Sequence, residues 1–254
     1  NTFSYKNSYR SKSSDKIFKE IQYTLEQYEN DKQAIYMGGM IFDLKDPNLI
    51  QLVNKLSDSP IVWRTESRVD CLTSKDVMKL MLTGLETIDW GLDSVSPNIL
   101  KIMRKTQNPE LYLEKATTLF RELKDEPILN KANIMFYPGE TAETITETIL
   151  YILANKDIID IVSPKPTMLY PGTIAYNEFN FYQKQYGTQK IHTAFWDNVH
   201  AYPMDLSYQL SYEQAQALSL LLERLVNKYD LYALNRKTNI GYNNLSKDVY
   251  LRLL

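Results

Sequence analysis

The chain has 254 residues and a formal net charge of −2, with 44% hydrophobic and 24% charged residues. This near-neutral balance argues against a general nucleic-acid clamp or a polybasic membrane anchor, and the composition is typical of a folded soluble protein. No stretch approaches the roughly 18 apolar residues that a membrane helix needs. The one cysteine, Cys71, excludes an intrachain disulfide and a cysteine-based zinc site.

Apolar strand-like runs alternate with amphipathic helical segments along the first two thirds of the chain. Ser13, Ser14 and Asp15 are candidate caps for a first helix, whose apolar positions continue to Tyr28. The pattern then predicts strands at 33–37, 60–65, 87–92, 132–137 and 158–162. It predicts helices at 47–56, 74–84, 97–104, 109–123 and 141–154.

The amino-acid composition changes after Pro166. Aromatic residues become dense between 170 and 202, and both histidines, His192 and His200, lie in this stretch. A helix is predicted at about 212–229, with an apolar face formed by Leu218, Leu221, Leu222, Leu225 and Tyr229. These features indicate a separate C-terminal segment that packs on the preceding α/β unit.

The regular alternation predicts an α/β fold with a parallel sheet and helices packed outside it. A barrel and a doubly wound open sheet both give this pattern. In either fold, active groups gather at the carboxyl ends of the strands. Those ends carry Gly38-Gly39, Arg64 to Asp70, Asp93-Ser94, Pro138-Gly139-Glu140 and Pro164-Lys165-Pro166.

Several short motifs follow one another in a recognisable order. They are Trp63 with Arg68-Val69-Asp70, Gly91-Leu92-Asp93-Ser94, Leu100 to Lys105, Pro138-Gly139-Glu140-Thr141 and Tyr170-Pro171-Gly172-Thr173. Arg10 to Ser13, before a helix that carries Glu20, adds an R-x-x-S…E element. Together these motifs resemble the radical S-adenosylmethionine superfamily over roughly residues 8–175. The similarity is greatest to the branch whose members often carry a cobalamin domain.

The resemblance implies a partial (β/α)6 TIM-like barrel over residues 1–173 and a C-terminal α-rich extension over 174–254 that covers it. It implies an enzyme that generates a 5′-deoxyadenosyl radical from S-adenosylmethionine for hydrogen abstraction or methyl transfer, as a transferase. A 4Fe–4S cluster and cobalamin are the further cofactors that the resemblance suggests. The expected partners are a small-molecule or peptide substrate and an electron donor, with no nucleic acid and no membrane, and the expected location is cytoplasmic.

The same resemblance assigns S-adenosylmethionine contacts to particular positions. Arg68 is expected to pair with the methionyl carboxylate, with an ion pair to Asp70 or Glu66 as the alternative. Asp93 and Ser94 are expected near the ammonium or ribose, and the alternative is a purely structural role in which Ser96 or Ser94 caps the next helix. The backbone of Gly38 and Gly39, which carries no side chains, is expected near the methionyl amino group. The backbone that adjoins Pro138 to Thr141 is expected near the adenine. The full set of expected cofactor contacts is Gly38, Gly39, Met40, Arg68, Asp93, Ser94, Tyr137, Pro138 and Leu169.

One family feature is missing from this sequence, the C-x-x-x-C-x-x-C cluster loop. The expectation is that its cysteines lie upstream of Asn1, together with the first strand, since the chain has no initial methionine. No metal ligand is therefore expected in this chain. The alternative is a catalytically inactive barrel that acts as a ligand- or peptide-binding module. A barrel hydrolase or lyase using Asp93 and Glu140 ranks last, because no compact acid–base motif is present.

Overall fold

Five strands form one parallel sheet in chain order. A computed structural model describes residues 12–27, 34–38, 41–192 and 194–227. The strands are β1 (Ala34–Met37), β2 (Val62–Ser67), β3 (Leu85–Asp93), β4 (Leu129–Phe136) and β5 (Ile161–Pro166). Each neighbouring pair is parallel. This order, without a strand reversal, is that of a partial barrel and confirms the predicted α/β class.

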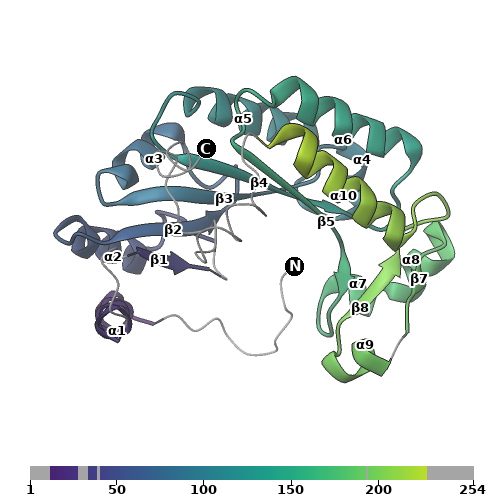
Figure 1. Cartoon of the computed structure of the whole chain (residues 1–254), viewed down its shortest axis with the longest axis horizontal. Helices are drawn as coiled ribbons and strands as arrows, with labels where there is room; N and C mark the ends of the chain where they lie inside the picture. The colour runs from purple at the N-terminus through teal and green to yellow at the C-terminus, as the bar shows by residue number, and fades with distance from the viewer. Residues whose placement is uncertain (1–11, 28–33, 39–40, 193, 228–254) are drawn as a thin grey trace.

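Helices connect the strands and begin at clear sequence signals. They are α1 (Ser14–Glu26), α2 (Pro47–Ser57), α3 (Ser74–Met81), α4 (Pro97–Ile102), α5 (Pro109–Glu122) and α6 (Ala142–Asn155). Proline stands at the start of α2, α4 and α5, where its missing N–H costs no hydrogen bond. Capping boxes start α3 and α6. Figure 1 shows α3, α5 and α6 covering one side of the sheet.

The core lies between this side of the sheet and the helices. Trp90 of β3 packs edge-on against Phe120 of α5, with ring centroids 6.4 Å apart. Both buried tryptophans of the sheet keep their indole N–H paired, Trp63 with the Thr83 carbonyl at 2.8 Å and Trp90 with Asn130 Oδ1 at 2.9 Å. Because side chains alternate along a strand, the neighbours of Trp90, Asp89 and Gly91, face the opposite side.

The last strand lies later in the chain than the sequence pattern predicts. The expected strand at 158–162 is wrong by about three residues, since β5 runs from Ile161 to Pro166 and includes Pro164. A proline cannot donate to a ladder, so two prolines argue against a central strand. β5 is the end strand of this sheet, where a missing N–H can face away from β4.

The C-terminal segment contains strands as well as helices. Its elements are β6 (Met168–Leu169), α7 (Ile174–Asn177), α8 (Phe179–Tyr186), β7 (Gln189–Lys190), α9 (Ala194–Val199), β8 (Tyr202–Asp205) and α10 (Tyr212–Val226). A small antiparallel sheet in the order β6-β8-β7 accompanies the helices of the expected α-rich extension. Figure 1 shows α7, α8, α9 and the small sheet beyond the carboxyl end of β5.

Helix α10 lies along β5, beside α6 (Figure 1). Its predicted apolar face is only partly buried: Leu222 is buried, whereas Leu221 and Leu225 are exposed. Two of the leucines on the predicted apolar face are thus open to solvent, and Tyr229 lies outside the described residues. None of the helices described combines the length and apolarity needed to cross a membrane.

Candidate functional site

Arg68 follows β2 and holds a carboxylate of its own chain. Its Nε and Nη2 donate to the two Asp70 oxygens at 2.8 and 2.7 Å, and Nη2 also reaches the Lys105 carbonyl at 3.1 Å. These hydrogen bonds raise the pKa of Arg68. Burial opposes ionisation of Asp70, but Arg68 outweighs it and lowers the Asp70 pKa. The alternative ion pair with Asp70 is thus present, and it displays the two-pronged geometry that a bound carboxylate would use.

Asp93 ends β3 in an unusual backbone conformation. Its φ is +64°, and the β3–β4 register shifts between Gly91 and Asp93. Lys105 Nζ binds Asp93 Oδ2 at 2.5 Å, and both side chains are largely shielded from solvent. On the other side of the strand end, the Tyr112 hydroxyl donates to the Gly91 carbonyl at 2.8 Å. Burial raises the pKa of Tyr112, so the phenol stays protonated and keeps donating.

Ser94 is buried and serves the local backbone. Its N–H donates to the Leu92 carbonyl at 2.8 Å, and its hydroxyl accepts from the Ser96 N–H at 3.2 Å. Ser96 itself occupies the N-cap of α4 without a side-chain hydrogen bond to the helix. The capping alternative is therefore half right, because the hydroxyl that satisfies this turn belongs to Ser94.

Gly38 follows β1 and is exposed. A Cβ there would lie 2.8 Å from the Tyr36 ring, so the missing side chain lets this ring pack against the backbone at the end of β1. Thr65 of β2 donates to the Met37 carbonyl at 3.2 Å and fixes the end of β1 beside β2. Gly39 and Met40, the other two expected contacts of this loop, lie outside the described residues.

The loop after β4 is buried and tied to the C-terminal segment. Tyr137 and Pro138 are both buried, and the Tyr137 hydroxyl lies 3.4 Å from that of Tyr182. The Gly139 N–H donates to the Leu206 carbonyl at 3.0 Å. Burial raises the pKa of Glu140 to about 7, against hydrogen bonds from Thr144 and the Tyr137 N–H that favour its charged form.

Leu169 is buried in β6 and pairs with Tyr202 of β8. Its backbone thus belongs to the small antiparallel sheet, at the junction between the α/β unit and the extension. The structure brings Arg68 and Asp93 together through Lys105. Tyr137, Pro138 and Leu169 lie on the part of the molecule that meets the extension.

Sequence reasoning missed a buried charge cluster on the face opposite the helices. Arg64 of β2 forms an ion pair with Asp89 of β3, and Lys131 of β4 binds the same carboxylate at 3.0 Å. The Arg64 guanidinium lies 4.5 Å from the centre of the Tyr36 ring, and the Tyr36 hydroxyl donates to Glu66. A signal was available in the sequence, because Arg64 and Asp89, which carry opposite charges, stand inside two of the predicted strands.

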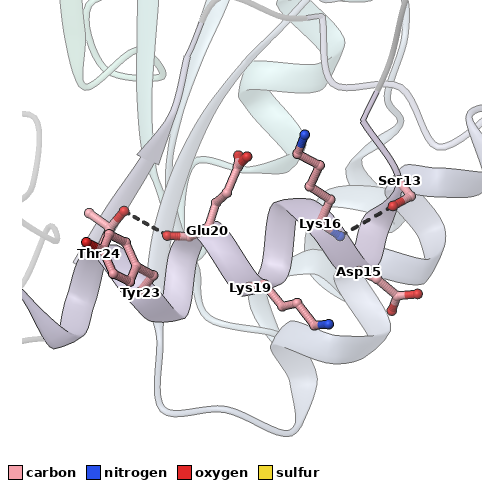
Figure 2. A pocket seen from close by; sticks show the side chains of 7 residues that line it. All are labelled: Ser13, Asp15, Lys16, Lys19, Glu20, Tyr23 and Thr24. Atoms are coloured by element: carbon pink, nitrogen blue, oxygen red, sulfur yellow. Dashed lines mark hydrogen bonds between the residues drawn. The ribbon is translucent and has the colours of Figure 1, made fainter.

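A surface hollow of about 680 Å³ lies elsewhere, on α1 (Figure 2). Figure 2 shows its lining side chains spread along one helix and its N-cap. All of them are exposed, and none is an expected cofactor contact: Ser13, Asp15, Lys16, Lys19, Glu20, Tyr23 and Thr24. The hollow therefore lacks the convergent, partly buried groups of a small-molecule site.

The two implied cofactors fit this chain differently. A guanidinium, a carboxylate and bare glycine backbone at neighbouring strand ends suit the carboxylate, ammonium and ribose of S-adenosylmethionine. A 4Fe–4S cluster needs several thiolates, and Cys71 is the one cysteine of the sequence. No three metal-ligating side chains converge in the part of the chain that the structure describes. The residues present do not fit the cluster, and no step is assigned to it.

Solved structures with the same fold include cobalamin-dependent enzymes. The radical S-adenosylmethionine methyltransferase TsrM from Kitasatospora setae, with cobalamin and a [4Fe-4S] cluster, matches with a TM-score of 0.56 and 16% identity over 72% of this chain and 37% of that one. The cobalamin-dependent enzyme OxsB, with aqua-cobalamin and S-adenosylmethionine, matches with a TM-score of 0.58 and 15% identity over 82% and 36%. Coproporphyrinogen III oxidase from Escherichia coli matches with a TM-score of 0.52 and 12% identity over 88% and 51%.

At such low identities these likenesses establish the fold alone. The chain spans little more than a third of the length of TsrM and OxsB. A sequence search of curated proteins finds no significant match. The sequence profile of the Radical SAM superfamily matches residues 2–152. Because this match spans more than half of the chain, the chain belongs to the radical S-adenosylmethionine superfamily.

Proposed function

We propose that this chain forms the S-adenosylmethionine-binding core of a radical enzyme that performs hydrogen abstraction or methyl transfer. The observation that carries the proposal is that Lys105 links Arg68 and Asp93 at the carboxyl ends of β2 and β3. Both residues lie inside the segment that the family profile matches. One electron from an external donor would break the C5′–sulfur bond of bound S-adenosylmethionine and release methionine. The 5′-deoxyadenosyl radical left behind would remove a hydrogen atom from an unreactive carbon.

The residues of this chain bind S-adenosylmethionine and orient it. Arg68 holds the methionyl carboxylate in place of Asp70, by the same two-pronged hydrogen bonding. Asp93 accepts hydrogen bonds from the ribose or the ammonium group. The exposed backbone at Gly38 lets the ligand approach the strand end, and the buried Tyr137-Pro138 and Leu169 segments flank the adenine. Shielding the radical from water is the contribution that the fold makes to the chemistry.

We propose cobalamin as a second cofactor and methyl transfer as the outcome in that case, with TsrM and OxsB as support. An external electron donor and a cytoplasmic setting are part of the same proposal. No residue of this chain is assigned to cobalamin.

The extension, residues 174–254, is proposed to cover the barrel mouth and to contact a small-molecule or peptide substrate. Three contacts with the barrel loops support this. They are Tyr137 with Tyr182, Gly139 with Leu206, and a two-pronged ion pair of Arg104 with Glu178, with both nitrogen–oxygen distances 3.0 Å. Limited proteolysis tests it: a stably folded fragment of residues 174–254 would mean an independent lobe instead.

Binding calorimetry tests the core proposal, with S-adenosylmethionine and S-adenosylhomocysteine as probes. Arg68→Ala is expected to weaken binding by at least ~1.5 kcal/mol, the low end for a hydrogen bond to a charged group. Arg121→Ala, an exposed arginine on α5, is the matched control and leaves affinity unchanged. Binding of S-adenosylmethionine without formation of 5′-deoxyadenosine, in protein isolated anaerobically from its natural source, would favour the non-catalytic binding module.

A further inference from the structure

One residue of the turn after α4 contacts both charged side chains of the candidate site. Lys105 Nζ binds Asp93 Oδ2 at 2.5 Å, while the Lys105 carbonyl accepts from Arg68 Nη2 at 3.1 Å. Its side chain therefore holds the group at the end of β3, and its backbone holds the group that follows β2. A displacement of this turn would move both together.

The Lys105 ammonium lies on one oxygen of Asp93 and close to the glycine beside it. A Cβ on Gly91 would lie 3.5 Å from Asp93 Oδ1 and 3.5 Å from Lys105 Nζ. Asp93 Oδ2 accepts from Lys105, so Oδ1 is the oxygen without the lysine, and it lies on the Gly91 side of the carboxylate, near the Ser67 carbonyl. Asp93 also has a left-handed backbone, and an ion pair on its side chain limits the orientations available to the carboxylate.

The turn is itself anchored on both sides. The Lys105 N–H donates to the Leu100 carbonyl at 3.0 Å, which closes the end of α4. Arg104, with φ of +54°, forms its two-pronged ion pair with Glu178, between α7 and α8. The turn that carries Lys105 is thus held by α4 and by the extension as well as by its contacts with the two strand ends.

We infer that Lys105 is a positioning residue for the S-adenosylmethionine pocket, an assignment that rests on the proposed function. Lys105 orients Asp93 so that Oδ1 receives the ribose or ammonium group, and its carbonyl keeps the Arg68 guanidinium level with the methionyl carboxylate. Lys105 acts through Asp93 and Arg68 and has no contact of its own with the ligand.

Calorimetry of the full chain with S-adenosylhomocysteine is the test, because this probe keeps the carboxylate, ammonium and ribose. Lys105→Met keeps the length of the side chain and removes its charge, and at least ~10-fold weaker binding is expected. Lys105→Arg restores the ion pair and is expected to bind within about threefold of the wild type. Lys101→Met, which changes an exposed lysine on α4 four residues earlier, is the matched control with unchanged affinity.

A double-mutant cycle separates positioning from a merely structural role. If Lys105 acts through Asp93, the double variant Lys105→Met/Asp93→Asn binds no more weakly than Asp93→Asn alone. Should Lys105→Met lose its cooperative thermal transition, Lys105→Gln takes its place in the cycle. Unchanged affinity in Lys105→Met, or fully additive losses, would overturn the assignment while the proposed function stands. A wild-type chain that does not bind the probe would overturn both.

Discussion

Asn227 binds both backbone groups of Val162. Its Oδ1 accepts from the Val162 N–H at 2.7 Å, and its Nδ2 donates to the Val162 carbonyl at 3.1 Å. Val162 lies in β5, the end strand of the sheet, and Asn227 follows α10. The amide therefore imitates one residue of a neighbouring strand. Beside it, Lys165 binds Glu223 of α10 at 2.6 Å, so α10 protects a sheet edge that would otherwise invite pairing with another chain.

Asn227→Ala is expected to lower the free energy of unfolding by about 1–3 kcal/mol, because two backbone groups lose their partner. Urea unfolding at neutral pH measures it. Gln216→Ala, an exposed amide on α10, is the control and changes stability by less than about 0.5 kcal/mol. Equal stability of the two variants would show that solvent satisfies Val162 equally well.

The carboxylate of Asp89 is expected to hold the charge cluster together. Asp89→Asn leaves the buried Arg64 and Lys131 without their shared countercharge, at an expected cost of about 3–5 kcal/mol in unfolding free energy. Replacing all three residues by apolar side chains of similar volume is expected to recover most of this loss. A single Asp89→Asn variant as stable as the wild type would contradict the prediction.

Glu140 is expected to make the fold less stable as the pH rises. Its pKa of about 7 in the folded chain lies above its ordinary value of 4.5, mainly because of burial. The folded chain therefore holds a proton that the unfolded chain has lost between these values. The stabilisation is complete below pH ~4.5 and falls as the pH rises through about 7, by roughly 3 kcal/mol in total.

Urea unfolding of Glu140→Gln at several pH values measures this effect. The variant is expected to match the wild type in acid and to exceed it in stability at pH ~8. Glu143→Gln, which changes an exposed glutamate in the first turn of α6, is expected to show no such pH-dependent divergence. A constant stability difference between Glu140→Gln and the wild type across this range would refute the shift.

Asp70 is expected to compete with a bound carboxylate for Arg68. Asp70→Asn removes one charge from the pair and is expected to tighten binding of S-adenosylhomocysteine by about fivefold, since a half-exposed ion pair contributes about 1 kcal/mol. Calorimetry at two salt concentrations measures it, and higher salt should reduce the gain. Weaker binding by Asp70→Asn would instead make Asp70 a support for Arg68.

Local pattern predicts the sheet of this protein well because each strand is a short apolar run between helix signals. It fails at β5, where Pro164 and Pro166 disguise an end strand. It also misses the link from Lys105 to Asp93 and Arg68. The motif that contains Lys105 is visible in the sequence. The contacts of Lys105 with Asp93 and Arg68 depend on where the turn after α4 lies relative to the ends of β2 and β3. The Arg64–Asp89–Lys131 cluster depends likewise on the register of three strands.

The left-handed backbone of Asp93 changes how substitutions at this position must be compared. Asparagine adopts this conformation readily, whereas alanine there costs about 1–2 kcal/mol in backbone strain. An alanine scan would therefore report a folding penalty as lost ligand affinity. The difference between Asp93→Ala and Asp93→Gly isolates the conformational part, because both variants lack the carboxylate, and Asp93→Asn, which keeps the backbone conformation, reports the loss of the charge.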